Sequence, residues 1–210
     1  METILYVDAC VNRETSRTER LAQALLAKLT DGREAHVSTL VLEDADMRPL
    51  TGDDVNRRTQ LARAGAFDDV LFDAAKQMSQ ADTVVIAAPY WDLSFPSKLK
   101  VYVEHLCAQG VTFRYSEAGV PVSLCRGKRL YYVTTSGGYV GELDFGYQQI
   151  KALFTLFFSG SRRRNGFRAE GFDICSPTTL MLLCPRLWPT SSRPNLINIS
   201  KAWQRKRSTR

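Results

Sequence analysis

Apolar residues along the chain form short continuous runs that alternate with longer stretches of helical spacing. The runs Ile4–Val7 and Asp82–Ala88 are typical of strands buried on both faces of a parallel sheet. His36–Leu42 and Arg129–Thr135 are predicted as two further main strands, and Phe167–Ile174 as a fifth. Because helical stretches separate these runs, the pattern predicts an α/β, doubly wound parallel sheet with right-handed connections.

The helical stretches carry apolar residues three or four positions apart. In the first of them Leu21, Leu25 and Leu29 share one face, and Ser16 or Thr15 is the expected N-cap. A small hairpin with a turn at Ala118-Gly119 is expected within Gly110–Val122. The predicted helices are Arg17–Leu29, Asp53–Gly65, Phe67–Gln80, a stretch through Leu99 and Leu106 with Pro96 in its first turn, and Gly146–Phe158.

Three loops at strand ends are the candidate sites. In doubly wound sheets ligands bind outside the carboxyl ends of the strands, so Asp8–Thr18, Pro89–Lys100 and Ser136–Tyr139 are expected to meet. The second loop, PYWDLSFPSKLK, is tight, aromatic and bounded by prolines, which suits a flat ligand. Together the loops indicate a crevice for a nucleotide or a flavin.

Composition and charge limit the classes of function. The 210 residues, 44% apolar, suffice for one large domain or for a domain with an appendage. Residues 1–158 carry 17 Lys and Arg against 20 Asp and Glu, whereas residues 159–210 carry 11 against 2. Nucleic acid is therefore not an expected ligand of the first part. If the basic end bound nucleic acid or an anionic surface, that binding would weaken steeply with salt.

Cysteine and histidine usage argues against a disulfide framework or a metal centre. The five cysteines are odd in number, form no Cys-x-x-Cys pair and follow no secretory signal, so a reduced cytoplasm is expected. No apolar run approaches the roughly 18 residues of a membrane span. His36 and His105 lack partners at ligand spacing. Cys10 could be taken for a redox nucleophile, but a lone cysteine at a strand end is more typical of a small buried residue.

Ser16, Arg17 and Thr18 are the candidate phosphate ligands. Two hydroxyls, a guanidinium and the free N–H groups at a helix N-terminus suit a phosphate monoester. Alternatively, Ser16 only caps the helix. In the second loop Trp91 and Phe95 could instead plug the end of the core, and the adjacent glycines after the fourth strand also occur in ordinary turns.

Over Thr3–Phe158, and weakly at Phe167–Ile174, the chain resembles flavodoxin-like, FMN-dependent NAD(P)H oxidoreductases of the azoreductase and quinone-reductase type. The matching pieces are Ser16-Arg17-Thr18, Pro89–Pro96 as P-x-W-x-L-x-F-P, Gly110–Tyr115 and Thr134–Gly138. The resemblance implies a five-stranded sheet in the order 2-1-3-4-5. It also implies that the cofactor-binding residues are Cys10, Ser16, Arg17, Thr18, Pro89, Tyr90, Trp91, Asp92, Leu93, Thr135, Ser136, Gly137 and Gly138.

The same resemblance implies an activity and a partner. NADH or NADPH would be the co-substrate of a ping-pong hydride transfer through FMN to a quinone, an azo compound or a similar small acceptor, and no residue is assigned as a general acid. A homodimer is implied, and Phe113 and Tyr115 of the hairpin either contribute to its interface or to the pocket wall, or are folded back on their own domain. A flavin-binding electron carrier or regulatory module without turnover is the alternative.

The sequence departs from the family pattern after Phe158: the strand Phe167–Ile174 is kept, but Ser159–Gly166 before it is polar and basic. Members continue with an amphipathic helix that covers the sheet, whereas residues 175–210 contain four prolines and no Asp or Glu. We therefore expect a flavodoxin-like FMN-binding domain over residues 1–174 and an atypical basic tail, disordered or irregular, over 175–210. One hypothesis for this composition is an altered reading frame after Ile174.

Overall fold

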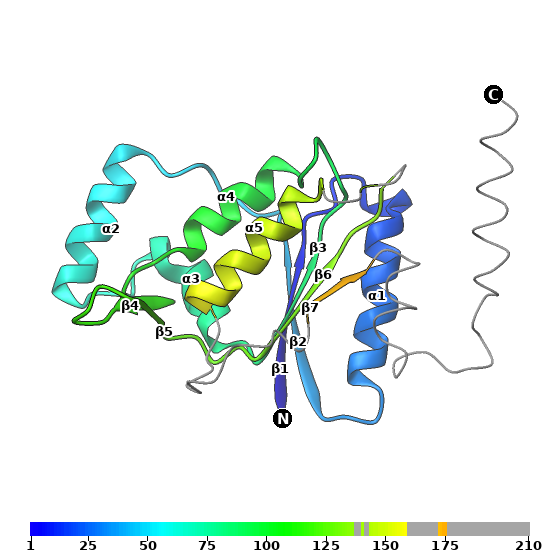
Figure 1. Ribbon diagram of the computed structural model, residues 1–210, viewed down its shortest axis with the longest axis horizontal. Helices are drawn as coiled ribbons and strands as arrows, with labels where there is room; N and C mark the ends of the chain where they lie inside the picture. Colours follow the sequence, from blue (N-terminus) through cyan, green and yellow to red (C-terminus); the bar gives the residue numbers. More distant parts are fainter. Residues whose placement is uncertain (137–139, 141–142, 159–171, 176–210) are drawn as a thin grey trace, which may run out of the picture.

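A parallel sheet forms the centre of the molecule (Figure 1). The computed structural model describes residues 1–136, 140, 143–158 and 172–175. Four parallel strands lie in the order β2-β1-β3-β6, and a short strand, β7, pairs in parallel with β6. The α/β fold and the order of the four main strands are thus confirmed. The strands are β1 (Glu2–Asp8), β2 (Ala35–Val41), β3 (Thr83–Ala87), β6 (Arg129–Val133) and β7 (Phe172–Cys175).

Helices cover both faces of the sheet (Figure 1). Leu25 and Leu29 of α1 pack with Ile4 and Tyr6 of β1 on one face. Helices α3, α4 and α5 pack on the other face, where Leu99 lies in the main core. Every residue of β3 is buried, as its continuous apolar run predicted. The helices are α1 (Arg17–Thr30), α2 (Gly52–Ala64), α3 (Asp73–Gln80), α4 (Ser97–Leu106) and α5 (Phe145–Leu153).

Local signals fix several helix ends. The Ser16 side chain accepts the Glu19 N–H at 3.1 Å, so the predicted N-cap of α1 is confirmed. Thr51 and Asp54 form a capping box at the start of α2. That helix ends at Gly65, whose φ of 68° is in the left-handed region that glycine adopts without strain.

The predicted helix Phe67–Gln80 is wrong in its first turns. A short 3₁₀ turn, Val70–Phe72, precedes α3, and the Asp69 side chain accepts the Leu71 N–H at its start. Phe67 lies before the helical segment and packs against Gly110, where a Cβ would approach the Phe67 ring to 2.6 Å. Tertiary packing therefore overrides the helical spacing of Phe67.

The helix expected over Gly146–Phe158 differs in a similar way. Helix α5 ends at Leu153, and Phe154–Phe158 form a π-helical turn. The predicted hairpin is confirmed: β4 (Phe113–Tyr115) pairs antiparallel with β5 (Pro121–Ser123), and Gly119 lies in the turn with a φ of 73°. None of the helices in the described ranges is long and apolar enough to cross a bilayer.

Candidate functional site

The loops after β1, β3 and β6 meet at one cavity of about 260 Å³. All three are loops that the sequence marked as candidate sites, and they converge because parallel strands end at the same edge of the sheet. Among the described residues, the lining is Val11, Asn12, Thr15, Ser16, Arg17, Thr18, Pro89, Tyr90, Trp91, Thr135 and Ser136.

The first wall of the cavity is the N-terminus of α1. Arg17 contributes the sole charged side chain among the residues that line the described cavity, and no carboxylate lines it. The Thr18 and Thr135 hydroxyls lie 2.7 Å apart and join this wall to the end of β6. Ser16 both caps the helix and lines the cavity, so the two roles considered for it are compatible.

Cys10 lies beneath this wall, not in it. Its side chain is 2% exposed, and burial raises the pKa of the thiol to about 12 although a hydrogen bond with Ser16 opposes the shift. A thiol of that pKa is a poor nucleophile at neutral pH, as expected for a small buried residue. Cys10 is not among the cavity-lining residues.

The second wall is a tight turn after β3. Trp91 and Ser94 exchange backbone hydrogen bonds of 3.1 and 2.7 Å, and the two residues between them have positive φ, 49° at Asp92 and 64° at Leu93. Positive φ is costly for leucine, so surrounding contacts must hold this turn in shape. Trp91 is 47% exposed and lines the cavity, whereas Phe95 is buried in the core. The core-plug alternative therefore holds for Phe95 and not for Trp91.

Hydrogen bonds from the segment that opens α5 hold the turn. The Tyr90 hydroxyl donates to the Leu143 carbonyl, and the Phe145 N–H donates to the Leu93 carbonyl, both at 3.1 Å. Gly146 touches the turn so closely that a Cβ there would come within 3.0 Å of the Ser94 carbonyl carbon. The turn after β3 and the segment that opens α5 are thus joined into one unit.

Not every predicted site residue lines the cavity. Asp92 and Leu93 lie in the turn but outside the lining, and Gly137 and Gly138 lie outside the described residues, as does Tyr139. Val11 and Asn12 line the cavity without having been selected individually, although they belong to the predicted loop Asp8–Thr18. Their position between the end of β1 and the N-cap of α1 could have identified them from the sequence.

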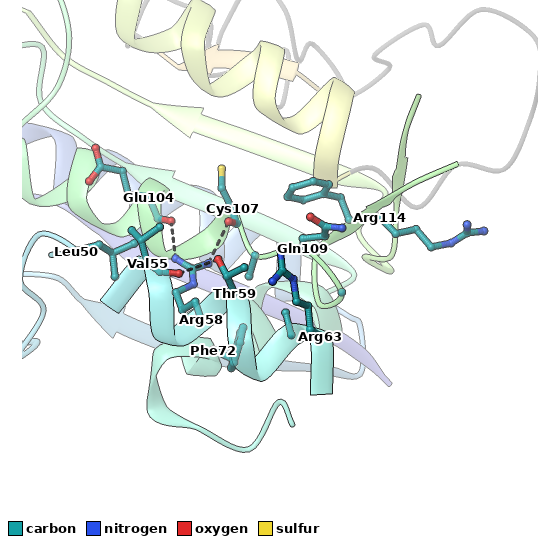
Figure 2. Close-up of a pocket in the computed structure, with 14 residues that line it drawn as sticks. Leu50, Val55, Arg58, Thr59, Arg63, Phe72, Glu104, Cys107, Gln109 and Arg114 are labelled. Atoms are coloured by element: carbon teal, nitrogen blue, oxygen red, sulfur yellow. Dashed lines mark hydrogen bonds between the residues drawn. The ribbon is translucent and has the colours of Figure 1, made fainter. Parts of the chain in front are cut away.

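A larger cavity of about 640 Å³ lies between α2, the end of α4 and the hairpin, and it shares no described lining residue with the first (Figure 2). Arg58 points from α2 to the end of α4, where it donates to the carbonyls of Glu104, His105 and Cys107 at 3.3, 3.4 and 3.0 Å. Sequence reasoning missed this cavity because tertiary packing alone brings the elements together. In the described ranges no group of three His, Cys, Asp or Glu is placed to hold a metal.

A flavodoxin-like α/β protein with a cavity at its strand ends is the class that the fold and site define. A family described by its flavodoxin-like fold matches residues 2–179. FMN-dependent NADH:quinone oxidoreductase 2 of Clostridium acetobutylicum is 32% identical over 179 residues, which cover 83% of this chain and 88% of that protein. The FMN-dependent NADH:quinone oxidoreductase of Rhizobium meliloti is 31% identical over 181 residues, covering 81% and 86%.

A solved structure supports the same fold. The azoreductase of Bacillus anthracis superposes with a TM-score of 0.68 at 21% identity, over 89% of this chain and 93% of that one. The chain belongs to the flavodoxin-like family of FMN-dependent NADH:quinone oxidoreductases. The family resemblance inferred from the sequence is thereby confirmed.

Proposed function

We propose that this protein is an FMN-dependent NADH:quinone oxidoreductase that also reduces azo compounds. The observation that carries the proposal is the cavity at the strand ends, in which hydroxyls and one guanidinium surround a helix N-terminus and no carboxylate is found among the described lining residues. The relatives whose names state this activity match more than four fifths of the chain.

The residues present fit FMN. Ser16, Arg17 and Thr18 supply the donors and the positive charge that a phosphate requires. When bound, FMN supplies the hydride and electron chemistry that links NADH to the acceptor.

The chain supplies position and an apolar surface for this chemistry. The turn at Trp91 presents backbone groups and an aromatic face to the cavity, and the predicted contacts of Pro89, Tyr90, Asp92 and Leu93 belong to the same turn. We extend the site to Cys10, Gly137 and Gly138 on the strength of the family pattern. Side chains such as Leu93 and Phe145, both about half-exposed, provide the apolar rim on which a planar acceptor can stack.

The chain is also proposed to form a homodimer. Apolar side chains are exposed on the hairpin at Tyr115, Val120 and Val122, which supports an interface there. Phe113 is buried and contacts Tyr115 edge to face, with ring centroids 5.6 Å apart, so it would support the interface from beneath.

The proposal also covers the strand order, the domain bounds and the cellular compartment. The sheet has five strands in the order 2-1-3-4-5, supported by the parallel pairing of Phe172–Cys175 with β6. Residues 1–174 form the FMN-binding domain, and residues 175–210, an atypical basic segment, lie outside the described residues except for Cys175. The free thiols of Cys10, Cys107 and Cys125 support a reducing cytoplasm.

The test is the visible spectrum of the purified protein together with NADH oxidation. We expect flavin absorbance, which FMN addition restores if it is lost, and NADH consumption that depends on an added quinone. NADPH run in parallel measures the nucleotide preference. Flavin binding without quinone-dependent NADH consumption would favour the electron-carrier alternative, and failure to bind FMN would refute the proposal.

A further inference from the structure

Asp8 places a buried negative charge beneath the phosphate-binding wall. It ends β1 and is 1% exposed. One carboxylate oxygen accepts the Cys10 N–H at 2.9 Å and the other accepts Nε of Arg13 at 3.0 Å. The Cys10 side chain is in turn hydrogen-bonded with Ser16, so a single residue separates the carboxylate from the phosphate-binding wall. A buried carboxylate there disfavours binding of a phosphate dianion unless its charge is compensated.

Arg13 is the group that compensates it. Its side chain is 44% exposed, and its guanidinium also lies 3.5 Å from Asp44, an acidic residue shortly after β2. Arg13 belongs to a 3₁₀ turn, Arg13–Thr15, in which Thr15, like the preceding Asn12, lines the cavity. The Arg13 side chain does not line the cavity, so its charge is directed at Asp8 and not at a ligand.

The backbone of Arg13 connects this ion pair to the wall itself. Its carbonyl accepts the Ser16 N–H at 3.3 Å, directly before α1. The Asp8–Arg13 contact therefore holds the end of β1 to the turn that presents Ser16. Loss of the contact would release the turn and leave Asp8 buried without its cation.

We propose that Arg13 is a positioning residue for the phosphate group of FMN, acting by neutralising Asp8 and by holding the turn before Ser16. This inference rests on the proposed function, because it assumes that FMN binds at Ser16–Thr18. It separates the two arginines of the loop: Arg17 faces the phosphate, whereas Arg13 removes a repulsion beneath it.

The experiment compares dissociation constants for FMN and riboflavin, measured by quenching of flavin fluorescence on apoprotein prepared from the full chain. Riboflavin lacks the phosphate, so it reports the ring site alone. We expect Arg13→Gln to weaken FMN about tenfold or more while it changes riboflavin affinity less than about threefold. The double variant D8N/R13Q should bind FMN at least about threefold more tightly than Arg13→Gln, because no uncompensated charge remains and the amide oxygen can still accept the Cys10 N–H, but it should stay weaker than wild type because the ion pair that holds the turn is lost.

Two further variants keep the outcomes distinct. Arg13→Lys retains the charge and is expected to bind FMN much more tightly than Arg13→Gln, whereas Arg20→Gln, an exposed arginine outside the cavity lining, should match wild type. Equal weakening of FMN and riboflavin, no effect of Arg13→Gln, or no rescue in D8N/R13Q would overturn the inference. If wild type itself bound no FMN, the proposed function would fail instead.

Discussion

Arg17 is the residue on which the phosphate end of the cavity depends. It is the one charged lining side chain that the structure describes there. We expect Arg17→Ala to weaken FMN binding by about tenfold or more, the range of one charge-assisted hydrogen bond, with little change in stability. Flavin retained through gel filtration and the FMN dissociation constant measure this. Arg20→Ala on the same helix is the control, and equal retention in both variants would contradict the assignment.

Burial of Cys10 leads to a prediction about its reactivity. Since desolvation raises the thiol pKa to about 12, only about one molecule in 10⁴ is a thiolate at pH 8, and the fraction grows only as pH approaches that value. Iodoacetamide at pH 8 should therefore leave Cys10 unmodified in the native protein while partly exposed Cys107 reacts first. Peptide mass spectrometry reads both sites, with the denatured protein as the positive control. Rapid native alkylation of Cys10 would revive the redox-nucleophile interpretation.

Position 146 requires glycine because its backbone lies against the turn after β3. A Cβ at this position would lie 2.8 Å from a ring carbon of Phe95 and 3.0 Å from the Ser94 carbonyl carbon. We expect Gly146→Ala to lower the free energy of unfolding by about 1–3 kcal/mol, because backbone must shift to make room. Urea denaturation measures the loss.

Gly52 offers the matched control for that substitution. It opens α2, and a Cβ there would meet no atom within 4 Å. Gly52→Ala should leave stability unchanged or slightly raised, since alanine has the higher helix propensity. Equal effects of the two substitutions would show that the close contact at Gly146 carries no energetic weight.

Individual site residues could be predicted where they lie next to a predicted strand end or helix start. Ser16, Arg17 and Thr18 precede or open the first helix, so the sequence places them at a strand end. The turn after β3 was less accessible, because the left-handed backbone at Asp92 and Leu93 has no glycine to signal it. Hydrogen bonds from a distant segment, such as Phe145 N–H to the Leu93 carbonyl, impose that conformation and leave no local pattern.

At the scale of the elements, the C-terminal end of α4 is capped by an arginine side chain from α2. Arg58 of α2 is 9% exposed and donates to three carbonyls at the end of α4, so burial, which lowers its pKa, is compensated by these acceptors. We expect Arg58→Ala to cost about 2–3 kcal/mol of unfolding free energy, measured by urea denaturation.

A neighbouring arginine separates this capping role from a general charge effect. Arg63 lies on the same helix and is exposed. Arg63→Ala should change stability by less than about 0.5 kcal/mol. If the two alanine variants were equally stable, the hydrogen bonds from Arg58 would have no role in holding α2 to α4.

Elements with continuous or strongly periodic apolar residues were predicted almost to the residue. Thr83–Ala87 is buried throughout, and α1 extends one residue beyond the predicted Arg17–Leu29. The helix expected from Phe67 failed because the Phe67 ring packs against Gly110, a contact between residues 43 positions apart. Periodicity measures only whether a face can be buried, and it cannot tell which partner buries it.

At the scale of the whole molecule, two groups of neighbouring residues are prominent among the exposed apolar side chains that the structure describes. One is the turn after β3 with the start of α5, where Trp91, Leu93 and Phe145 are each about half-exposed, and the other is the hairpin. Exposed apolar groups of this kind are typical of surfaces that a partner covers. In a symmetric dimer each copy buries the same surface, so an exposed apolar group on one copy is available to cover its counterpart on the other.

The hairpin allows a direct test of the proposed dimer with a matched pair of substitutions. Val120 is 57% exposed on the hairpin, and Val70 is 74% exposed in the turn before α3. We expect Val120→Asp to shift the protein toward monomer in sedimentation equilibrium, because a carboxylate resists burial against an apolar partner. Val70→Asp should remain dimeric, since it adds the same charge to a surface that the proposed interface does not use. A wild-type monomer, or dissociation of both variants alike, would exclude the hairpin as the dimer contact.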